Sequence, residues 1–384
     1  MKKILYFFPL NPITQDAGCK TRALRLLEYF KNRAFVTDFV GLEYWDTWSM
    51  ENLNQLRDSS LINKLILIPS PPVKKGLSRL LKKKKTKDIF DKRLKVKGAL
   101  PNFTTSHVRK SFDEILKNSH YDFIIISYAY WADLIYENSF LNNAKTIIDT
   151  HDLLTSQIQN QEGINLGKSF QEEFRRLDLF DEIWAISIDE QYLFSQFVKK
   201  KVRLVPITFD APQIDETIVP DFDLLYVASD NENNIKSINW FVTEVYPKLP
   251  KGIKICVIGK VTLYIDNLSG VVKIPFAQNL ATFYQRSKIA LCPMLAGTGV
   301  KIKVVEAFSF GLPVVCTTRG IDGLPNKINN GCLVSDDPDE FALNIVKLIN
   351  DNTLYSKQKA LAREMFNLAF DSEVCLKLLD SSFI

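Results

Sequence analysis

The sequence of 384 residues has no long hydrophobic run, because no segment reaches the roughly eighteen consecutive apolar residues that a membrane-spanning helix needs. A membrane-spanning protein is therefore excluded, and any membrane contact is expected to be peripheral. The N-terminal stretch MKKILYFFPLNP breaks at Asn11 and Pro12 without a small-residue cleavage site. We therefore expect a first buried strand here rather than a signal peptide.

Motif-forming cysteines and the common glycine-rich phosphate loops are also missing. The 6 cysteines are scattered without C-x-x-C spacing, and several lie in apolar runs, which predicts reduced core residues of a cytosolic protein. Neither half opens with a Walker A sequence or with G-x-G-x-x-G. These absences disfavour a P-loop enzyme and a dinucleotide oxidoreductase.

The residues that are present predict two α/β domains. Hydrophobic residues make up 46% of the chain and charged residues 24%, as in ordinary globular proteins, and the length favours two domains. Short apolar runs alternate with amphipathic stretches in both halves, which predicts two Rossmann-like, doubly wound parallel sheets facing across a cleft. The predicted parts are a first domain at residues 1–206, a second domain at residues 207–364, and a C-terminal helix at 365–384 that crosses back to the first domain. A proline-rich linker at 206–220 joins the two domains.

The segment LAGTGVKIKVVEAFSFGLPVV, residues 295–315, places two glycines and two lysines before an amphipathic pattern. Apolar residues at helical spacing predict a helix that begins near Gly299. The first N–H groups of a helix lack internal partners and carry the positive end of its dipole, so a diphosphate fits there. The predicted diphosphate site comprises Gly297, Thr298, Gly299, Val300, Lys301 and Lys303.

Glu306 lies seven residues beyond Gly299, which is two helical turns and about 10 Å along the axis. Its carboxylate is expected to accept hydrogen bonds from both hydroxyls of a ribose attached to the diphosphate, and together these groups make a nucleotide. A second interpretation stays open from the residues alone. In it the G-T-G stretch is a tight turn, the lysines are solvated, and Glu306 pairs with one of them across a helix turn.

The stretch ALCPMLAGTGVKIKVVEAFSFGLPVVCTTRGIDGL resembles the donor-site signature of GT-B glycosyltransferases of family 4, in the branch with a G-T-G-x-K-x-K-x-x-E-A helix. A second stretch, DLLYVASDNENNIKSINWFVTEVYPKLP, resembles the first strand, loop and helix of that branch's donor domain. The resemblance implies that Glu306 orients the ribose, that Asn233 or Asn234 lines the donor loop, and that sugar transfer retains the anomeric configuration.

The sequence departs from the family pattern at two places. The family usually has two glutamates eight positions apart, and counting back from Glu306 reaches Thr298, so the first acid is missing. This acid lies near the sugar in the family, and its absence leaves the choice of sugar open. The basic pair that grips the diphosphate has only Lys236 as a candidate, with Lys301 or Lys303 as substitutes.

The N-terminal half carries the weaker part of the resemblance. AGCKTRALRLLEYF resembles the family's first glycine-rich turn and helix, which implies that Gly18 and Arg22 lie on the acceptor side. TIIDTHDLLT resembles the strand end that carries a histidine facing the sugar, and FDEIWAISIDE the strand that follows. The resemblance therefore assigns His151 to the sugar, and the predicted catalytic residues are His151, Lys303 and Glu306.

The carboxylates of the DTHD and DFD stretches are of the type that can hold a divalent metal. We predict no metal, because the helix N-terminus and the lysines already supply positive charge at the diphosphate. No other cofactor is expected, since the nucleoside-diphosphate sugar is a co-substrate.

The segment from Lys74 to Lys97 holds twelve basic and two acidic residues, the strongest charge asymmetry of the chain. Two interpretations stay open: a solvated loop, or a basic amphipathic segment drawn to anionic lipid headgroups. Nucleic acid is not an expected partner, because the cluster lacks a recognisable nucleic-acid fold and an aromatic platform.

These observations together predict a retaining glycosyltransferase that needs no metal and moves a sugar from a nucleoside-diphosphate sugar to a saccharide or lipid-linked acceptor, in the cytoplasm or at the inner membrane face. Two alternatives remain open. A nucleotide-sugar 2-epimerase would share the architecture but would need acid and base carboxylates. A catalytically inactive binding subunit would agree with Thr298 in place of the first glutamate.

Overall fold

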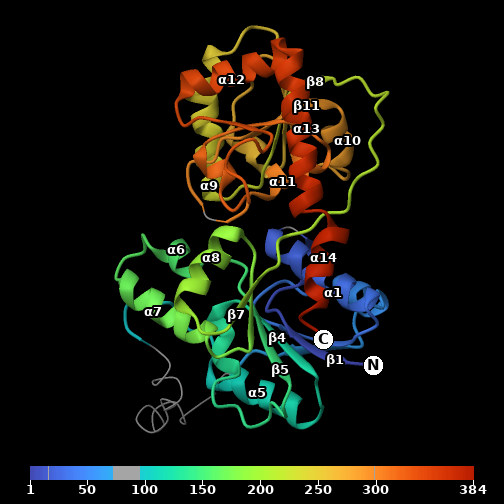
Figure 1. Cartoon of the computed structure of the whole chain (residues 1–384), viewed down its shortest axis with the longest axis vertical. Helices are drawn as coiled ribbons and strands as arrows, with labels where there is room; N and C mark the ends of the chain where they lie inside the picture. Colours follow the sequence, from blue (N-terminus) through green and yellow to red (C-terminus); the bar gives the residue numbers. More distant parts are fainter. Residues whose placement is uncertain (16, 72–95, 298) are drawn as a thin grey trace. The chain divides into compact units, whose positions relative to one another are not determined.

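The computed structural model describes residues 1–15, 17–71, 96–297 and 299–384 (Figure 1). The chain divides into two compact units. Unit 1 contains Met1–Ile186 and Glu190–Leu204, and unit 2 contains Ser187–Asp189 and Val205–Ile384. Most of the basic segment from Lys74 to Lys97 lies outside the described residues, and its membrane role stays a prediction.

Unit 1 is built on a parallel sheet, which has seven strands in the described part of the chain. The order across the sheet is β3-β2-β1-β4-β5-β6-β7, so the chain reverses its direction of travel between β1 and β4. Such a reversal is the point at which open α/β sheets bind ligands, at the carboxyl ends of the strands. The strands are β1 (Lys3–Phe7), β2 (Val36–Leu42), β3 (Lys64–Ile68), β4 (Phe123–Ser127), β5 (Lys145–Asp149), β6 (Glu182–Ala185) and β7 (Lys201–Leu204).

Helices cover both faces of this sheet because neighbouring residues of a strand point to opposite sides. Leu5 shares a core cluster with Phe112 of α5, whereas the ring of Tyr6 packs on the other face, 5.8 Å from the ring of Phe30 in α1. The helices are α1 (Gly18–Asn32), α2 (Met50–Asp58), α5 (Ser106–Lys117), α6 (Leu154–Ile158), α7 (Leu166–Leu177) and α8 (Ile188–Phe197).

Unit 2 repeats the architecture with six parallel strands among the residues described. The order is β10-β9-β8-β11-β12-β13, and the direction reverses between β8 and β11. The strands are β8 (Phe222–Val227), β9 (Ile255–Ile258), β10 (Val271–Ile274), β11 (Ser287–Cys292), β12 (Val314–Cys316) and β13 (Cys332–Val334). Each coincides with a predicted apolar run, so the expectation of two doubly wound parallel sheets is confirmed.

The two faces of the unit 2 sheet are covered by different helices. Leu225 shares a core cluster with Phe308 of α11, while its neighbour Leu224 shares another with Phe341 of α12. The helices are α9 (Glu232–Trp240), α10 (Ala281–Gln285), α11 (Ile302–Ser309), α12 (Pro338–Asn350), α13 (Asn352–Ala369) and α14 (Ser372–Asp380).

Two predicted boundaries concern the joins between domains. Residues 206–220 belong to no helix or strand, apart from an isolated bridge between Phe209 and Asp371. Residues 365–384 contain the end of α13 and the separate helix α14. The division after residue 206 and the crossing of the last helix stay predictions. Among the described residues, none of the helices combines the length and the apolar character needed to cross a membrane.

Candidate functional site

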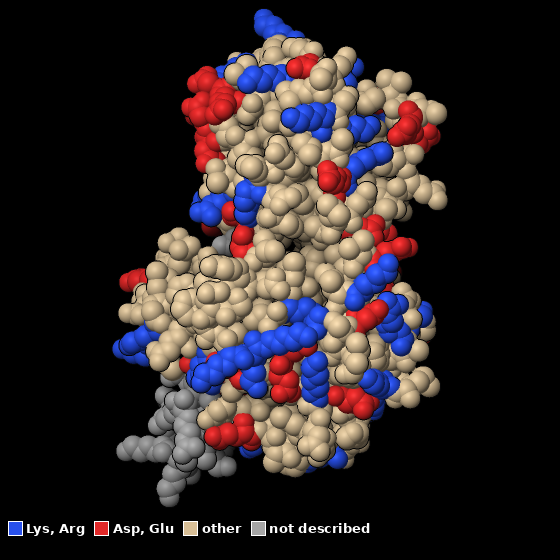
Figure 2. All heavy atoms as spheres, in the orientation of Figure 1, with Lys and Arg blue, Asp and Glu red and all other residues tan. Residues whose placement is uncertain are grey.

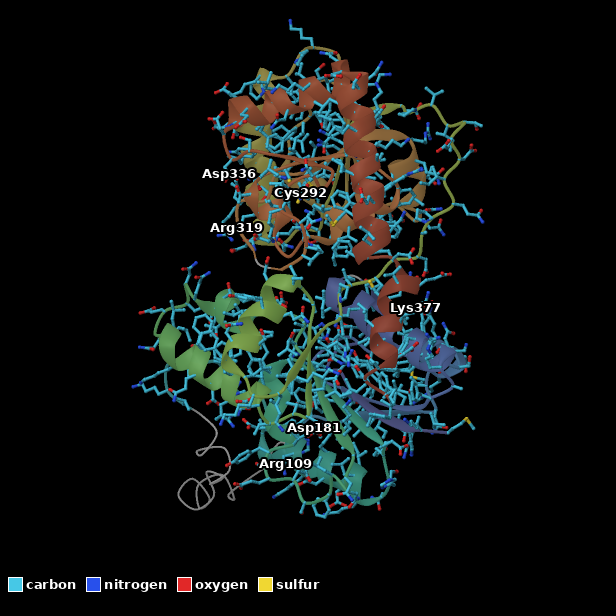
Figure 3. All side chains as sticks on the ribbon, in the orientation of Figure 1. Arg109, Asp181, Cys292, Arg319, Asp336 and Lys377 are labelled. Atoms are coloured by element: carbon cyan, nitrogen blue, oxygen red, sulfur yellow. The ribbon has the colours of Figure 1, made fainter. Side chains whose placement is uncertain are left out.

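The loop between β11 and α11 holds most of the predicted diphosphate site. It follows Cys292, which lies inside unit 2 where β11 ends (Figure 3). Gly297 and Gly299 have φ angles of 99° and 73°, which belong to the left-handed region that favours glycine. Residues in this conformation cannot belong to a right-handed helix. The helix predicted to begin near Gly299 therefore excludes both glycines, and α11 begins three residues later at Ile302 with Lys301 as its N-cap residue.

The left-handed turn wraps around the side chain of Lys301. The Lys301 ammonium donates to the carbonyl oxygen of Gly299 at 2.8 Å and to that of Gly297 at 3.4 Å. It also lies 3.9 Å from the Asp322 carboxylate, and the lysine side chain is buried. A fixed cation thus stands directly before the first turn of α11, where unpaired N–H groups and the helix dipole add positive potential. Thr298 lies outside the described residues.

Lys303 joins the α11 turn to the neighbouring helix α9. Its ammonium donates to the side-chain oxygen of Asn234 at 2.9 Å and lies 4.7 Å from the centre of the Tyr226 ring. Burial lowers the pKa of Lys303 to about 8, because the charged ammonium loses solvation among these groups. The ammonium is therefore mostly charged at neutral pH and close to its point of deprotonation.

The first turn of α9 supplies the predicted asparagine contacts. Asn234 is buried, and its amide donates to the Ser229 carbonyl and hydroxyl oxygens, each at 3.1 Å. Asn233 lies against the loop, since a Cβ added to Gly297 would come within 3.4 Å of its side-chain nitrogen. Lys236 has a side chain that is 66% exposed and pairs at 3.8 Å with Glu232. The structure thus brings Asn234 and Lys303 together and leaves Lys236 on the exposed side of α9.

Glu306 stands closer to the start of α11 than the sequence indicated. Because the helix begins at Ile302, Glu306 is one turn into it, about 6 Å along the axis at 1.5 Å per residue, and not two turns. Its carboxylate accepts a hydrogen bond of 3.0 Å from the Tyr284 hydroxyl. Burial raises the pKa of Glu306, and the bond from Tyr284 and the charge of Lys303 oppose that rise.

The positive charge at this loop is local. On the face of unit 2 seen in Figure 2, basic and acidic groups are interspersed, and neither sign forms a continuous field. The acidic residues of the DFD stretch have cationic partners, since Asp221 pairs with Arg286 and Asp223 accepts from Lys288 at 2.8 Å. A diphosphate would therefore be recognised by the few groups at the start of α11 rather than by a general basic surface.

The corresponding edge of unit 1 carries a buried ion pair. Arg22 of α1 donates to the Asp149 carboxylate through Nε at 2.9 Å and through Nη2 at 2.7 Å, and both side chains are buried. Burial alone would raise the pKa of Asp149, but the charges of Arg22 and His151 and the hydrogen bonds from Arg22 hold it below its ordinary value. Gly18, the first residue of α1, is half-buried at the same helix end.

His151 follows β5 in an unusual backbone conformation, with a φ angle of 60°. Its ring stacks on Tyr128 with the ring centres 4.3 Å apart and lies 5.6 Å from the ring of Phe8. Its Nε2 atom approaches Asp149 to 3.0 Å but is poorly aligned, so the contact is electrostatic rather than a well-formed hydrogen bond. The functional assignments of His151, Arg22 and Gly18 stay predictions.

Several residues that shape these sites gave no signal in the sequence. Tyr226 lies within a buried strand, Tyr284 precedes a strand, and Tyr128 follows one, so each looked like an ordinary core aromatic. Each reaches its partner only through the fold, as Tyr284 does when its hydroxyl meets Glu306 across 22 positions of sequence. A local pattern could not have identified them.

Comparison with solved structures defines the class of this fold. Sucrose-phosphate synthase from Thermosynechococcus elongatus is similar over 100% of this chain and 98% of its own, with a TM-score of 0.70 and 13% identity. HepE from Anabaena, solved in complex with UDP, is similar over 100% of this chain and 99% of its own, with a TM-score of 0.67 and 13% identity. The two parallel sheets are those of the GT-B fold.

The family follows from the sequence of unit 2. Residues 221–351 match the family model described as Glycosyl transferases group 1, so the chain carries a domain of that family, as the resemblance of its donor-site stretch implied. A Klebsiella pneumoniae protein described as an uncharacterized 44.6 kDa protein in the cps region is 23% identical over 309 residues, which are 72% of this chain and 76% of that protein.

Proposed function

We propose that this protein is a retaining glycosyltransferase that binds a nucleoside-diphosphate sugar on unit 2 and transfers the sugar to an acceptor bound on unit 1, without a metal ion. The observation that carries the proposal is the juxtaposition of Lys301, Lys303 and Glu306 at the first turn of α11. Two ammonium groups and a helix N-terminus suit a diphosphate, and a carboxylate one turn further suits the adjoining ribose.

The chemistry assigns separate tasks to these groups. Departure of the nucleoside diphosphate places negative charge on its leaving oxygen, and preorganised cations stabilise such charge without rearrangement. Lys303 is suited to this task because the Asn234 amide and the Tyr226 ring fix its ammonium. Glu306 would hold the ribose hydroxyls, with Tyr284 orienting the carboxylate. The resemblance assigns His151 to the transferred sugar.

The comparisons favour a particular donor and a general class of acceptor. HepE was solved with UDP, so a uridine diphosphate sugar is the first donor to test. The Klebsiella pneumoniae relative is described by the cps region, which supports an acceptor from polysaccharide biosynthesis. The base, the sugar and the acceptor are all part of the proposal.

The test measures donor binding and transfer separately. Thermal unfolding is followed with UDP, GDP, ADP and dTDP, because a nucleotide that binds only the folded protein raises its melting temperature. We expect a rise with UDP that is much smaller in the Glu306→Gln variant and unchanged in Lys347→Ala, an exposed lysine of α12. No rise with any nucleotide would refute the proposed donor site.

Transfer itself is assayed with UDP-sugars, an acceptor extract and excess EDTA. Retained turnover in the chelator is expected, and complete loss that Mg²⁺ or Mn²⁺ restores would refute the metal-independent mechanism. Conversion of the donor to its 2-epimer without an acceptor would identify an epimerase instead. Nucleotide binding without transfer or donor hydrolysis would support the inactive binding subunit.

A further inference from the structure

Aromatic side chains form a row along the carboxyl edge of the unit 1 sheet, and the proposed transfer chemistry does not use them. The row consists of Trp45, which follows β2, Phe103, and Tyr128 and Tyr130, which follow β4. It ends at His151, which follows β5. Strand ends of this kind are where parallel α/β sheets bind ligands.

The rings of the row are in continuous contact. The ring centres of Trp45 and Phe103 are 5.2 Å apart, and those of Phe103 and Tyr130 are 4.7 Å apart. Tyr130 and Tyr128 follow at 6.4 Å, and Tyr128 stacks on His151 at 4.3 Å. Because β1 and β4 separate β2 from β5, the row crosses three strand intervals, or roughly 14 Å. This length exceeds that of a single sugar ring.

The row packs against a buried aromatic residue of the core and is partly exposed to solvent. Trp131 is buried, and its ring centre lies 5.2 Å from that of Trp45, so it supports the indole from the core side. The backbone N–H of Phe103 donates to the Tyr130 carbonyl at 3.1 Å, which joins two segments of the row. Trp45 is nevertheless 40% exposed, and Phe103, Tyr128 and Tyr130 are only partly buried.

Charged groups act on the tyrosines of the row. Burial raises the pKa of Tyr130 to about 12, with the charges of Glu173 and Asp152 contributing, so its hydroxyl stays protonated at neutral pH. The charge of Asp152, a half-buried residue next to His151 in the sequence, also contributes to the raised pKa of Tyr128. A groove for an isoprenoid chain would need an unbroken apolar lining, because burying a carboxylate against hydrocarbon is costly.

We propose that Trp45, Phe103, Tyr130 and Tyr128 form an acceptor subsite that binds an oligosaccharide, with sugar rings packed against the exposed parts of the Trp45, Phe103 and Tyr130 rings and the terminal sugar beside the stacked rings of Tyr128 and His151. The faces of sugar rings carry C–H groups that pack on aromatic rings, while their hydroxyls need donors and acceptors at the rim. This inference rests on the proposed function, since it names the class of acceptor.

The test titrates the whole protein, without donor, with a set of defined tri- and tetrasaccharides prepared as methyl glycosides, and with farnesyl phosphate. Tryptophan fluorescence and calorimetry report binding. We expect at least one oligosaccharide to bind, with affinity reduced about tenfold or more in Trp45→Ala and in Tyr130→Ala, because central aromatic residues dominate such contacts. Trp45→Phe keeps a ring and is expected to retain most of the affinity.

Tyr192→Ala is the matched control, since this tyrosine of α8 is 70% exposed and lies outside the row. Oligosaccharide binding that is indifferent to Trp45→Ala and Tyr130→Ala would overturn the inference, as would farnesyl phosphate binding that depends on Trp45 when no saccharide binds. Failure of every saccharide would also overturn it. UDP binding in the same protein shows separately whether the proposed donor site stands.

Discussion

The two units share one architecture but differ in how their sheet edges are built. In unit 2, the loop after β11 has glycines with left-handed φ angles and curls around Lys301. In unit 1, the non-glycine residues Tyr128 and His151 take left-handed φ angles of 67° and 60°, and aromatic rings line the edge. Cations and exposed amides suit a diphosphate, whereas ring faces suit a neutral sugar. The same scaffold therefore presents different chemical groups through its loops.

The charges of the two edges also differ in their surroundings. The Arg22–Asp149 pair of unit 1 is buried and mutually neutralised. In unit 2, Lys303 is only partly buried, and its nearest hydrogen-bond partner is a neutral amide. A buried pair is costly to break, whereas a cation held mainly by a neutral amide is available to an anionic ligand. We therefore expect unit 1 substitutions to affect stability most and unit 2 substitutions to affect donor binding.

The largest expected effect tests the buried pair. Arg22→Met leaves the Asp149 carboxylate buried without its bidentate partner, and breaking such a pair costs about 3 to 5 kcal/mol of unfolding free energy. Urea unfolding of the variant measures this loss. The double variant Arg22→Met with Asp149→Leu removes both charges and should recover most of the stability. A loss below about 1 kcal/mol in the single variant would contradict this account.

The second effect tests the cation of unit 2. Lys303→Ala removes the ammonium fixed by Asn234, and loss of one preorganised charge-stabilising group lowers kcat by about 10² to 10³-fold. Steady-state transfer measures this, with urea unfolding to show that the fold persists. Lys236→Ala is the informative comparison, because that lysine was also predicted to contact the diphosphate but has an exposed side chain on α9. Equal losses in both variants would remove the distinction between the two lysines.

The third effect concerns the carboxylate of α11. Glu306→Gln keeps the shape of the side chain but removes its negative charge. A hydrogen bond from the ribose to a charged carboxylate is worth about 1.5 to 3 kcal/mol, so UDP affinity should fall about tenfold to a hundredfold. Calorimetric titration with UDP measures it. The same variant should bind inorganic diphosphate as well as the original protein does, since the ribose is absent. A parallel loss of diphosphate affinity would place Glu306 on the phosphates.

The smallest effect is a pH dependence of donor binding. Lys303 has a lowered pKa of about 8, so its ammonium is charged below that pH and loses its proton as the pH rises through it. UDP affinity should therefore fall by about tenfold between pH 7 and pH 9, a range in which the phosphates, with a pKa near 6, stay ionised. Lys303→Arg keeps its charge throughout, so its UDP affinity should stay level. An affinity in the original protein that is independent of pH would contradict the role of Lys303.

Much of the fold was predictable because its signals are local. A strand buried on both faces needs a continuous apolar run, and a covering helix needs an apolar stripe, so the alternation of both along the chain predicts parallel sheets. The N-terminus of α12 can also be predicted from the sequence, since Asp337 caps it and acidic residues lie in its first turn. The stretch around Glu306 predicted a donor site through its residue types, its short spacing and its resemblance to a family signature.

The start of α11 shows where local patterns are insufficient. Apolar spacing continues back through Val300, but the φ angles of Gly297 and Gly299 decide that the turn wraps around Lys301 and that the helix begins at Ile302. Glycine permits either conformation, so the sequence alone cannot choose between them. The choice depends on what the loop packs against.

The sequence by itself determined the two parallel sheets, because these depend on periodicity within single elements, and the match of residues 221–351 to a glycosyl transferase family model. Only the tertiary structure decided that Arg22 meets Asp149, that Tyr284 meets Glu306, and that aromatic residues from three loops form one row. Such contacts join residues far apart in the chain. They arise from strand order, which places the ends of β2, β1, β4 and β5 side by side at one edge.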